Sequence, residues 1–379
     1  MSSDNQQNNY DPLTEEIGAL RDHFLPDGFL IEEIETIQQM KDTVSQLDNA
    51  LLQLAQTSNL SADSLEKVTQ EAFRLGDAVG RTGTEALSCI HAAIEAGYSM
   101  EDALKVAEEA LKMDNISPGI SNAEAAISHI KDILDGFGQN ASFAPAISDA
   151  LAGISEAGGT EFHLLAEGAS MLAESASMAG ISFEEMLGLF VGAYDSLKDF
   201  DQVTNGEKAL FTTLKTTHSE AQSVYEVLQE LHSAWEALDQ SSRESFSISS
   251  VGEEHHAVFT ALMNNWTAVE QAASFASDSF GAADEANSGY LDSISGKTAG
   301  LQNQVEKLSA ALRESGILDF FLELGTTGVG ALSAITDKIG ALGTLGALGG
   351  GYLGAKGLGQ HTCCGTNGCE AQEGAYRHV

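Results

Sequence analysis

One short stretch decides the fold class: Gly97-Tyr98-Ser99-Met100-Glu101-Asp102-Ala103-Leu104. Glycine directly after a helix adopts the left-handed conformation that ends it, and serine followed three residues later by an acid has the spacing of a capping box. The arrangement returns 83 residues later as Gly180-Ile181-Ser182-Phe183-Glu184-Glu185-Met186-Leu187. Each copy predicts a helix, a turn and a second helix, so the sequence indicates a weak internal repeat of αα-hairpins.

Apolar residues recur at helical spacing on both sides of these turns. Before Gly97, for example, Leu87, Ile90 and Ile94 lie three and four residues apart. The same pattern predicts helices over 30–57, 61–75, 210–238, 256–279 and 302–315, with Trp235 and Trp266 on apolar faces. Turn-forming residues predict loops near 114–121, 136–144, 158–160, 205–206 and 241–252.

The composition agrees with a helical protein that has a sizeable core. The 379 residues include only 4 Pro, 7% are aromatic and 43% are hydrophobic. We therefore expect an all-α fold of αα-hairpins and long amphipathic helices, elongated or bundled. Changes in texture predict five segments: a polar extension (1–37), a helical-hairpin core (38–200), long amphipathic helices (201–315), a Gly-rich apolar segment (316–359) and a Cys/His-containing tail (360–379).

The charge is strongly negative and uneven. Of the formal net charge of −38, residues 1–295 carry −37. Such a surface repels the phosphate backbone, so specific nucleic-acid binding is not expected. The polar N-terminus has no basic region and no apolar core of a secretion signal, so synthesis in a cytoplasm is expected.

The apolar end centres on residues 339–355, which contain seven Gly and no charge. Two interpretations stay open: a segment that enters a membrane, for which 17 residues is the lower limit of length, and a buried or oligomer-packed segment. Six residues are the candidate membrane or oligomer contacts: Ile339, Leu342, Leu345, Leu348, Tyr352 and Leu353.

Two motifs suggest a cofactor site or a metal site but lack the neighbouring elements or the spacing that such a site needs. Residues 349–354 satisfy G-x-G-x-x-G, but no strand or βαβ unit precedes them, so no dinucleotide cofactor is expected. The tail holds possible zinc ligands, but their spacing fits no structural zinc site and neighbouring cysteines rarely bind one ion. These ligands are His361, Cys363, Cys364, Cys369 and His378.

The remaining titratable residues do not form a catalytic arrangement in the sequence. Glu253, Glu254, His255 and His256 are adjacent and point to different sides of a helix, which favours a solvated helix N-terminus over a metal site. The other histidines are scattered singly, without a nucleophile elbow. We therefore expect no catalytic residue, no metal and no cofactor, and a protein that is not an enzyme.

The order of segments resembles the core region of phage tail tape-measure proteins from viruses of Gram-positive bacteria or their prophages. The resemblance covers Gln38 to Gly359 and rests on the stretches 40–51, 60–65, 75–84, 96–104, 179–188, 290–297 and 340–359. The last two stretches, Tyr290-Leu291-Asp292-Ser293-Ile294-Ser295-Gly296-Lys297 and the Gly-rich run after Gly340, are the most specific. Family members tend to have a basic turn where this chain has Gly252-Glu253-Glu254-His255, and they run on for hundreds of residues, so a core fragment or a short variant is expected.

The resemblance implies a structural ruler. Such proteins extend through the tail lumen, template the tail-tube protein and bind tail-assembly chaperones, and their apolar segments are thought to meet the host membrane. It implies a homo-oligomer that assembles in the host cytoplasm and resides in the virion tail. A fully helical chain of this length spans at most roughly 570 Å. From the residues alone we expect copies to associate through apolar helix faces within 61–238.

Two other classes of function remain as alternatives. A helical pore-forming or membrane-interacting effector would use residues 317–355, and it would release dye from liposomes as an isolated protein. A general helical scaffold or chaperone-like binder needs only the amphipathic helices.

Overall fold

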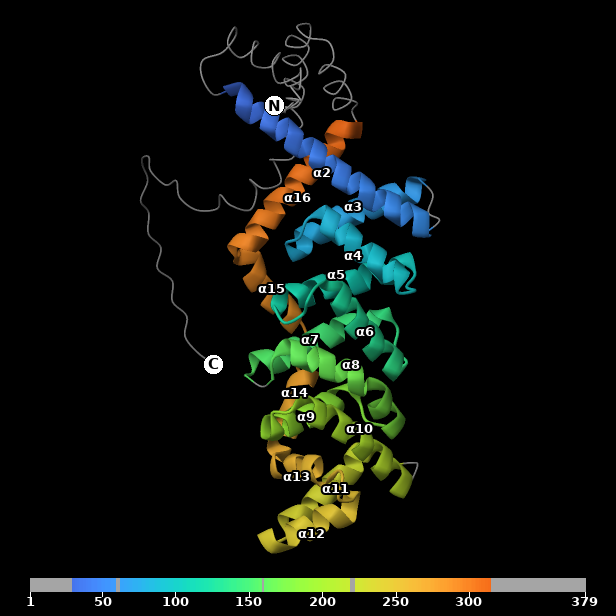
Figure 1. Ribbon diagram of the computed structural model, residues 1–379, viewed down its shortest axis with the longest axis vertical. Helices are drawn as coiled ribbons and strands as arrows, with labels where there is room; N and C mark the ends of the chain where they lie inside the picture. The colour runs from blue at the N-terminus through green and yellow to red at the C-terminus, as the bar shows by residue number, and fades with distance from the viewer. Residues whose placement is uncertain (1–28, 59–61, 159, 219–221, 315–379) are drawn as a thin grey trace, which may run out of the picture. The chain divides into compact units, whose positions relative to one another are not determined.

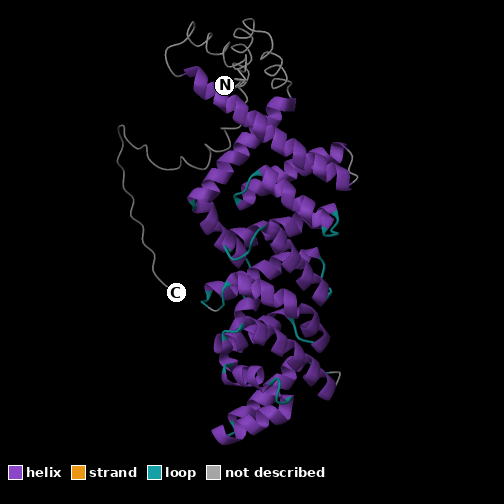
Figure 2. Ribbon diagram, in the orientation of Figure 1, coloured by secondary structure: helices purple, strands orange, loops and turns teal. Residues whose placement is uncertain are grey.

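The computed structural model describes residues 29–58, 62–158, 160–218 and 222–314 (Figure 1). All the regular elements in these ranges are helices, and none is a strand (Figure 2). The predicted all-α fold is confirmed. All the described residues belong to one compact unit, Leu20–Ser315.

The helices follow one another with short connections. Up to residue 200 they are α2 (Phe29–Ser58), α3 (Ala62–Val79), α4 (Gly83–Glu95), α5 (Met100–Ile116), α6 (Ala123–Phe137), the 3-10 turn η1 (Ala141–Phe143), α7 (Ala144–Glu156), α8 (Phe162–Ala179) and α9 (Phe183–Leu197). After it come α10 (Phe200–Thr217), α11 (Val224–Glu236), α12 (Gln240–Val251), α13 (His256–Asn264), α14 (Trp266–Ser277), α15 (Ala282–Asp292) and α16 (Ile294–Glu314).

The two repeated turns form as the sequence predicts. Gly97 and Gly180 have φ values of 102° and 77°, which only glycine adopts at little cost. The Ser99 hydroxyl accepts a hydrogen bond from the backbone N–H of Asp102. Ser182 forms a full capping box with Glu185. The αα-hairpins α4–α5 and α8–α9 are therefore set by local sequence.

The chain runs through the helices α3–α12 and then returns beside them. We call α13–α16 the return helices; they appear in yellow and orange in Figure 1. Among them, α14 packs against α9 and α7, α15 against α7 and α5, and α16 against α2, α3 and α4. Helices that are more than 200 residues apart in sequence thus become neighbours within this unit.

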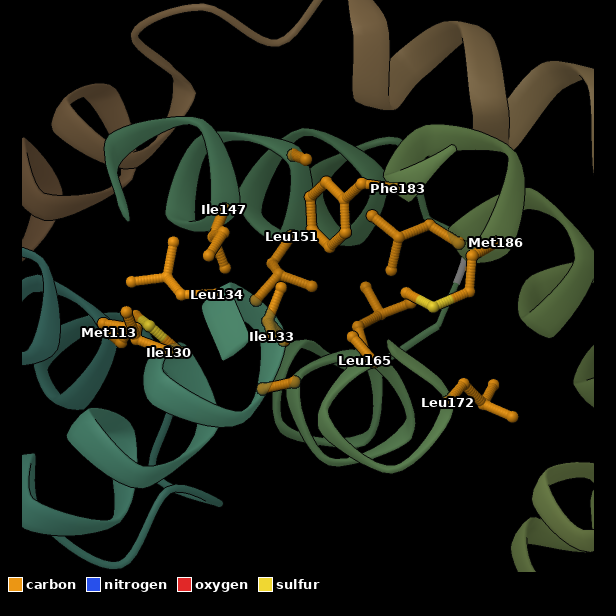
Figure 3. Close-up of a cluster of buried hydrophobic side chains, with 14 of the residues drawn as sticks. Met113, Ile130, Ile133, Leu134, Ile147, Leu151, Leu165, Leu172, Phe183 and Met186 are labelled. Carbon is orange, nitrogen blue, oxygen red and sulfur yellow. The ribbon is translucent and has the colours of Figure 1, made fainter. Parts of the chain in front are cut away.

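The core is continuous and rich in alanine. Figure 3 shows part of it, where Met113 of α5, Leu134 of α6, Leu151 of α7 and Leu165 of α8 converge. Aromatic side chains join it farther along, and Phe190 and Phe259 are fully buried. The apolar faces of helices within 61–238 are thus largely buried inside one chain, and their association between copies stays a prediction.

Small residues let α9 and α14 approach closely. A Cβ atom on Gly188 would lie 2.5 Å from the backbone oxygen of Val269 and 3.0 Å from Cβ of Ala273. Gly192, one turn later, also faces Val269. Since a backbone atom cannot rotate away, glycine at position 188 fixes the distance between these helices.

Two long helices were predicted after residue 200, and each prediction was wrong because the structure has two shorter helices in its place. The predicted helix 210–238 is divided, since α10 ends at Thr217 and Ser223 caps α11 in a capping box with Glu226. The predicted helix 256–279 is divided at Asn265, whose side-chain amide donates to the backbone oxygen of Gly192. Both tryptophans lie on apolar faces, as predicted, and are buried.

Two predicted loops were also wrong. Asn205 and Gly206 lie inside α10, where Gly206 packs against Val258. Residues 241–252 form most of α12, because the Asp239 carboxylate accepts from the N–H of Ser242 and starts a helix there. Tertiary packing and a strong cap outweigh the turn preference of these residues.

The remaining predictions concern the last helix, the boundary near residue 200 and the apolar end of the chain. The helix predicted over 302–315 exists but begins earlier, at Ile294. The proposed boundary near residue 200 stays a prediction, and α9 and α14 pack across it. Over the described ranges, no helix is both long enough and apolar enough to span a bilayer. The Gly-rich segment 316–359 and the tail 360–379 lie outside those ranges.

Candidate functional surface

A buried aspartate attaches the return helices to the earlier ones. Asp149 of α7 accepts hydrogen bonds from the backbone N–H groups of Gly281, at 2.9 Å, and Ala283, at 3.0 Å. These groups lie at the N-terminus of α15, which needs acceptors and favours negative charge. The carboxylate therefore caps a helix that lies 132 residues farther along the chain.

We expect Asp149→Ala to lower the stability of the unit by about 1–2 kcal/mol, because the orphan N–H groups of α15 lose their acceptor. The measurement is urea unfolding followed by circular dichroism. Asp149→Asn keeps one acceptor oxygen and should lose less. Equal stability of the alanine variant and the unchanged protein would show that Asp149 does not hold α15.

A buried lysine forms a second attachment. Lys112 of α5 lies 2.9 Å from Glu109 and 2.7 Å from Asp284 of α15. Burial lowers the pKa of Lys112, but the nearby carboxylates outweigh it, so the net pKa is raised and the side chain stays charged. Ser148 of α7 donates to the other oxygen of Glu109. The group links α5, α7 and α15.

The third attachment lies at α16. The Glu306 carboxylate accepts from the N–H of Thr84 at 2.9 Å, at the start of α4. Burial raises the pKa of Glu306, and the N–H groups of Thr84 and Gly83 oppose that shift. Asn303 donates to the backbone oxygen of Phe73 at 3.0 Å. Buried polar groups need such partners, so these contacts specify where α16 lies.

One buried acid has no partner. Glu207 of α10 is fully buried, and neither carboxylate oxygen has a hydrogen-bond partner among the described residues. Burial raises its pKa well above the ordinary value. It shares a helix face with the core residues Val203, Leu210 and Leu214. This spacing could have predicted a buried acid from the sequence, but the wrong loop prediction at residues 205–206 interrupted the helix in which it occurs.

Glu207→Met should stabilise the unit by about 1–3 kcal/mol, since an unsatisfied buried polar group is replaced by an apolar one. The folded-state pKa lies above the unfolded-state value. As pH rises between the two, the folded chain binds more protons than the unfolded chain, so the free energy of unfolding falls with rising pH. The gain should therefore be larger at pH 8 than at pH 5 in urea titrations. A variant that is less stable at both pH values would contradict this.

Apart from the adjacent His255 and His256, the described histidines and the described cysteine are placed singly. His91 bonds with Thr57, and His232 stacks on Trp266. Burial raises the pKa of Cys89 to about 12, so it remains a thiol. Within the described ranges no three His, Cys, Asp or Glu side chains are grouped to hold a metal ion.

The acid and histidine run before α13 behaves as a solvated turn. Glu253 and Glu254 are exposed, and His256 is the first residue of α13. The six candidate contacts, Ile339, Leu342, Leu345, Leu348, Tyr352 and Leu353, lie outside the described residues and stay a prediction, as do the cysteines of the tail.

Four of the exposed large apolar side chains lie in the last part of the described chain. Phe275, Phe280, Ile294 and Leu301 all belong to the return helices or their connections. Phe280 is 99% exposed and Phe275 is 46% exposed. Phe275 and Phe280 line one hollow together, and exposed apolar side chains that cluster mark interaction surfaces. The sequence did not predict this surface.

The described helices thus form one interlocked unit, and aromatic side chains are exposed on its return helices and their connections. The chain belongs to the family of phage-related minor tail proteins, whose family model matches residues 69–321, about two thirds of the sequence. The matched range begins in α3 and includes α4–α16, so it contains all three attachments of the return helices. The chain is thus a structural component of a phage tail. No solved structure matches it.

Proposed function

We propose that this chain is the core region of a tape-measure protein, which sets the length of a phage tail and scaffolds the assembly of its tube. Membership of the minor tail protein family carries the proposal, together with the all-helical construction. Because a helix has a fixed rise of about 1.5 Å per residue, a helical chain can convert its residue number into a length. The tail-tube protein and the tail-assembly chaperones are its proposed partners.

A ruler has to be extended, whereas the described helices fold back on one another. The proposal therefore includes an opening of this unit during assembly. Two properties of the chain favour opening. Residues 1–295 carry a net charge of −37, and repulsion among their acidic side chains destabilises the compact state. The unpartnered Glu207 weakens the core between α10 and its neighbours.

The test of the ruler is tail length after the coding length of the chain is changed. Electron microscopy of tails assembled with shortened chains measures it directly. Tails that shorten by a fixed length per residue removed would support the proposal, and a constant tail length would refute it.

The membrane role is proposed for the apolar end of the chain and is independent of the ruler. The full chain should float with liposomes in a density gradient, and a chain without residues 317–358 should stay at the bottom, because the deleted segment is apolar and almost neutral while the remainder is acidic. Equal flotation of the two proteins would remove the membrane role and leave the ruler untouched.

A further inference from the structure

A small cavity lies between the end of α14, the start of α15 and the end of α7. Its volume is about 250 Å³. Two phenyl rings, Phe275 and Phe280, and three carboxylates, Glu156, Asp278 and Glu285, line it. All five side chains are exposed. None of the three acids has an ion-pair partner in the part of the chain that the structure describes, and Asp278 accepts a hydrogen bond from the Ser274 hydroxyl at 3.4 Å.

The connection that displays Phe280 is firmly held. On one side of Phe280, Ser279 is buried, and its Oγ donates to the backbone oxygen of Ala276 at 2.7 Å. The same residue lies against Gly153 of α7, where an added Cβ would meet it at 2.7 Å. On the other side, the N–H of Gly281 donates to Asp149. Phe280 is therefore exposed by a fixed backbone and is available before any partner binds.

We propose that this cavity receives a lysine or arginine side chain from a basic segment of another protein. Aromatic faces attract cations, and guanidinium groups in particular stack on them. The three carboxylates, which have no ion-pair partner among the described residues, supply the opposite charge at the same place.

Other occupants fit the charges less well. The chain has 18 basic residues against 56 acidic ones, so a second copy offers few cations and much repulsion. An anionic membrane surface is repelled by the same acids. A basic partner protein is attracted over the whole surface and is then held at the phenyl rings.

The test uses the full chain and a fluorescently labelled tetra-arginine peptide, with binding measured by fluorescence anisotropy at low ionic strength. Phe280→Ala should weaken binding about fivefold, because it removes a cation–π contact and leaves every charge in place. Phe280→Trp should bind at least as tightly as the unchanged chain. Met178→Ala, at an exposed apolar residue of α8, is the control and should bind normally.

Charge is tested by a matched pair of substitutions. Glu285→Gln should weaken binding more than Glu244→Gln, which removes the same charge from an exposed position on α12. The same peptide with citrulline in place of arginine should not bind. Equal binding by Phe280→Ala and the unchanged chain would overturn the proposal, because the attraction would then be diffuse.

Two further outcomes would replace the proposed occupant. Sedimentation velocity measures self-association, and dimerisation that is lost in Phe280→Ala would assign the surface to a second copy. Flotation with vesicles of phosphatidylcholine and phosphatidylglycerol that depends on Phe280 would assign it to a membrane. Either result overturns a basic protein segment as the occupant.

Discussion

Gly188→Leu should abolish the close packing of α9 and α14 and destabilise the unit by about 3 kcal/mol or more. Even the first carbon of the new side chain would lie 2.5 Å from the backbone oxygen of Val269, and a backbone atom cannot rotate away. The helices must then separate, and the buried residues between them lose contact. The effect is large because α14 is the return helix that packs against both α9 and α7. Urea unfolding measures it.

Gly289→Leu is the matched control for this substitution. Gly289 also lies inside a helix, α15, but nothing lies within 4 Å of a Cβ placed there. Leucine forms helices better than glycine by roughly 0.5–1 kcal/mol, so this variant should be as stable as the original or more stable. Comparable losses at both positions would contradict a specific role for the α9–α14 contact.

The hairpins could be predicted from sequence because their signals are local. A glycine in the left-handed conformation and a serine cap act within six residues, and they end and begin helices regardless of what packs on them. Thus Gly97 with Ser99 and Gly180 with Ser182 occur in the structure as predicted. Apolar residues at helical spacing, which are also a local signal, gave α2 almost residue for residue, with 30–57 predicted and Phe29–Ser58 observed.

The return of the chain could not be predicted in this way. The contacts that place α15 and α16 join residues such as Asp149 and Gly281, or Thr84 and Glu306, that are 132 and 222 residues apart. Nothing near Asp149 in the sequence distinguishes it from the many exposed acids. The break at Asn265 depends on the backbone of Gly192, on another helix, for the same reason.

The candidate surface was missed for a related cause. Phe280 lies in a turn after a predicted helix, and only the fixed positions of Ser279 and Gly281 make it exposed. Glu207 is different, because its position between Val203 and Leu210 on one helix face can be read from the sequence once α10 is treated as continuous. Local turn preference at Asn205 and Gly206 gave the opposite answer.

The central claim concerns length. A suitable segment to remove is 223–252, which contains α11 and α12, because α12 packs mainly on α13 and α10. None of the three attachments of the return helices lies in it. Removing these residues shortens a fully helical chain by about 45 Å. Replacing them with the same number of residues of an unrelated helix-forming sequence keeps the helical length and removes the native contacts, so it separates length from local packing.

The decisive measurement is therefore the tail length, by electron microscopy, of phages that carry each of these two chains. The ruler predicts tails that are about 45 Å shorter with the deletion and of unchanged length with the helical replacement. Tails of unchanged length in the deletion, with normal assembly, would contradict the claim that this chain measures the tail.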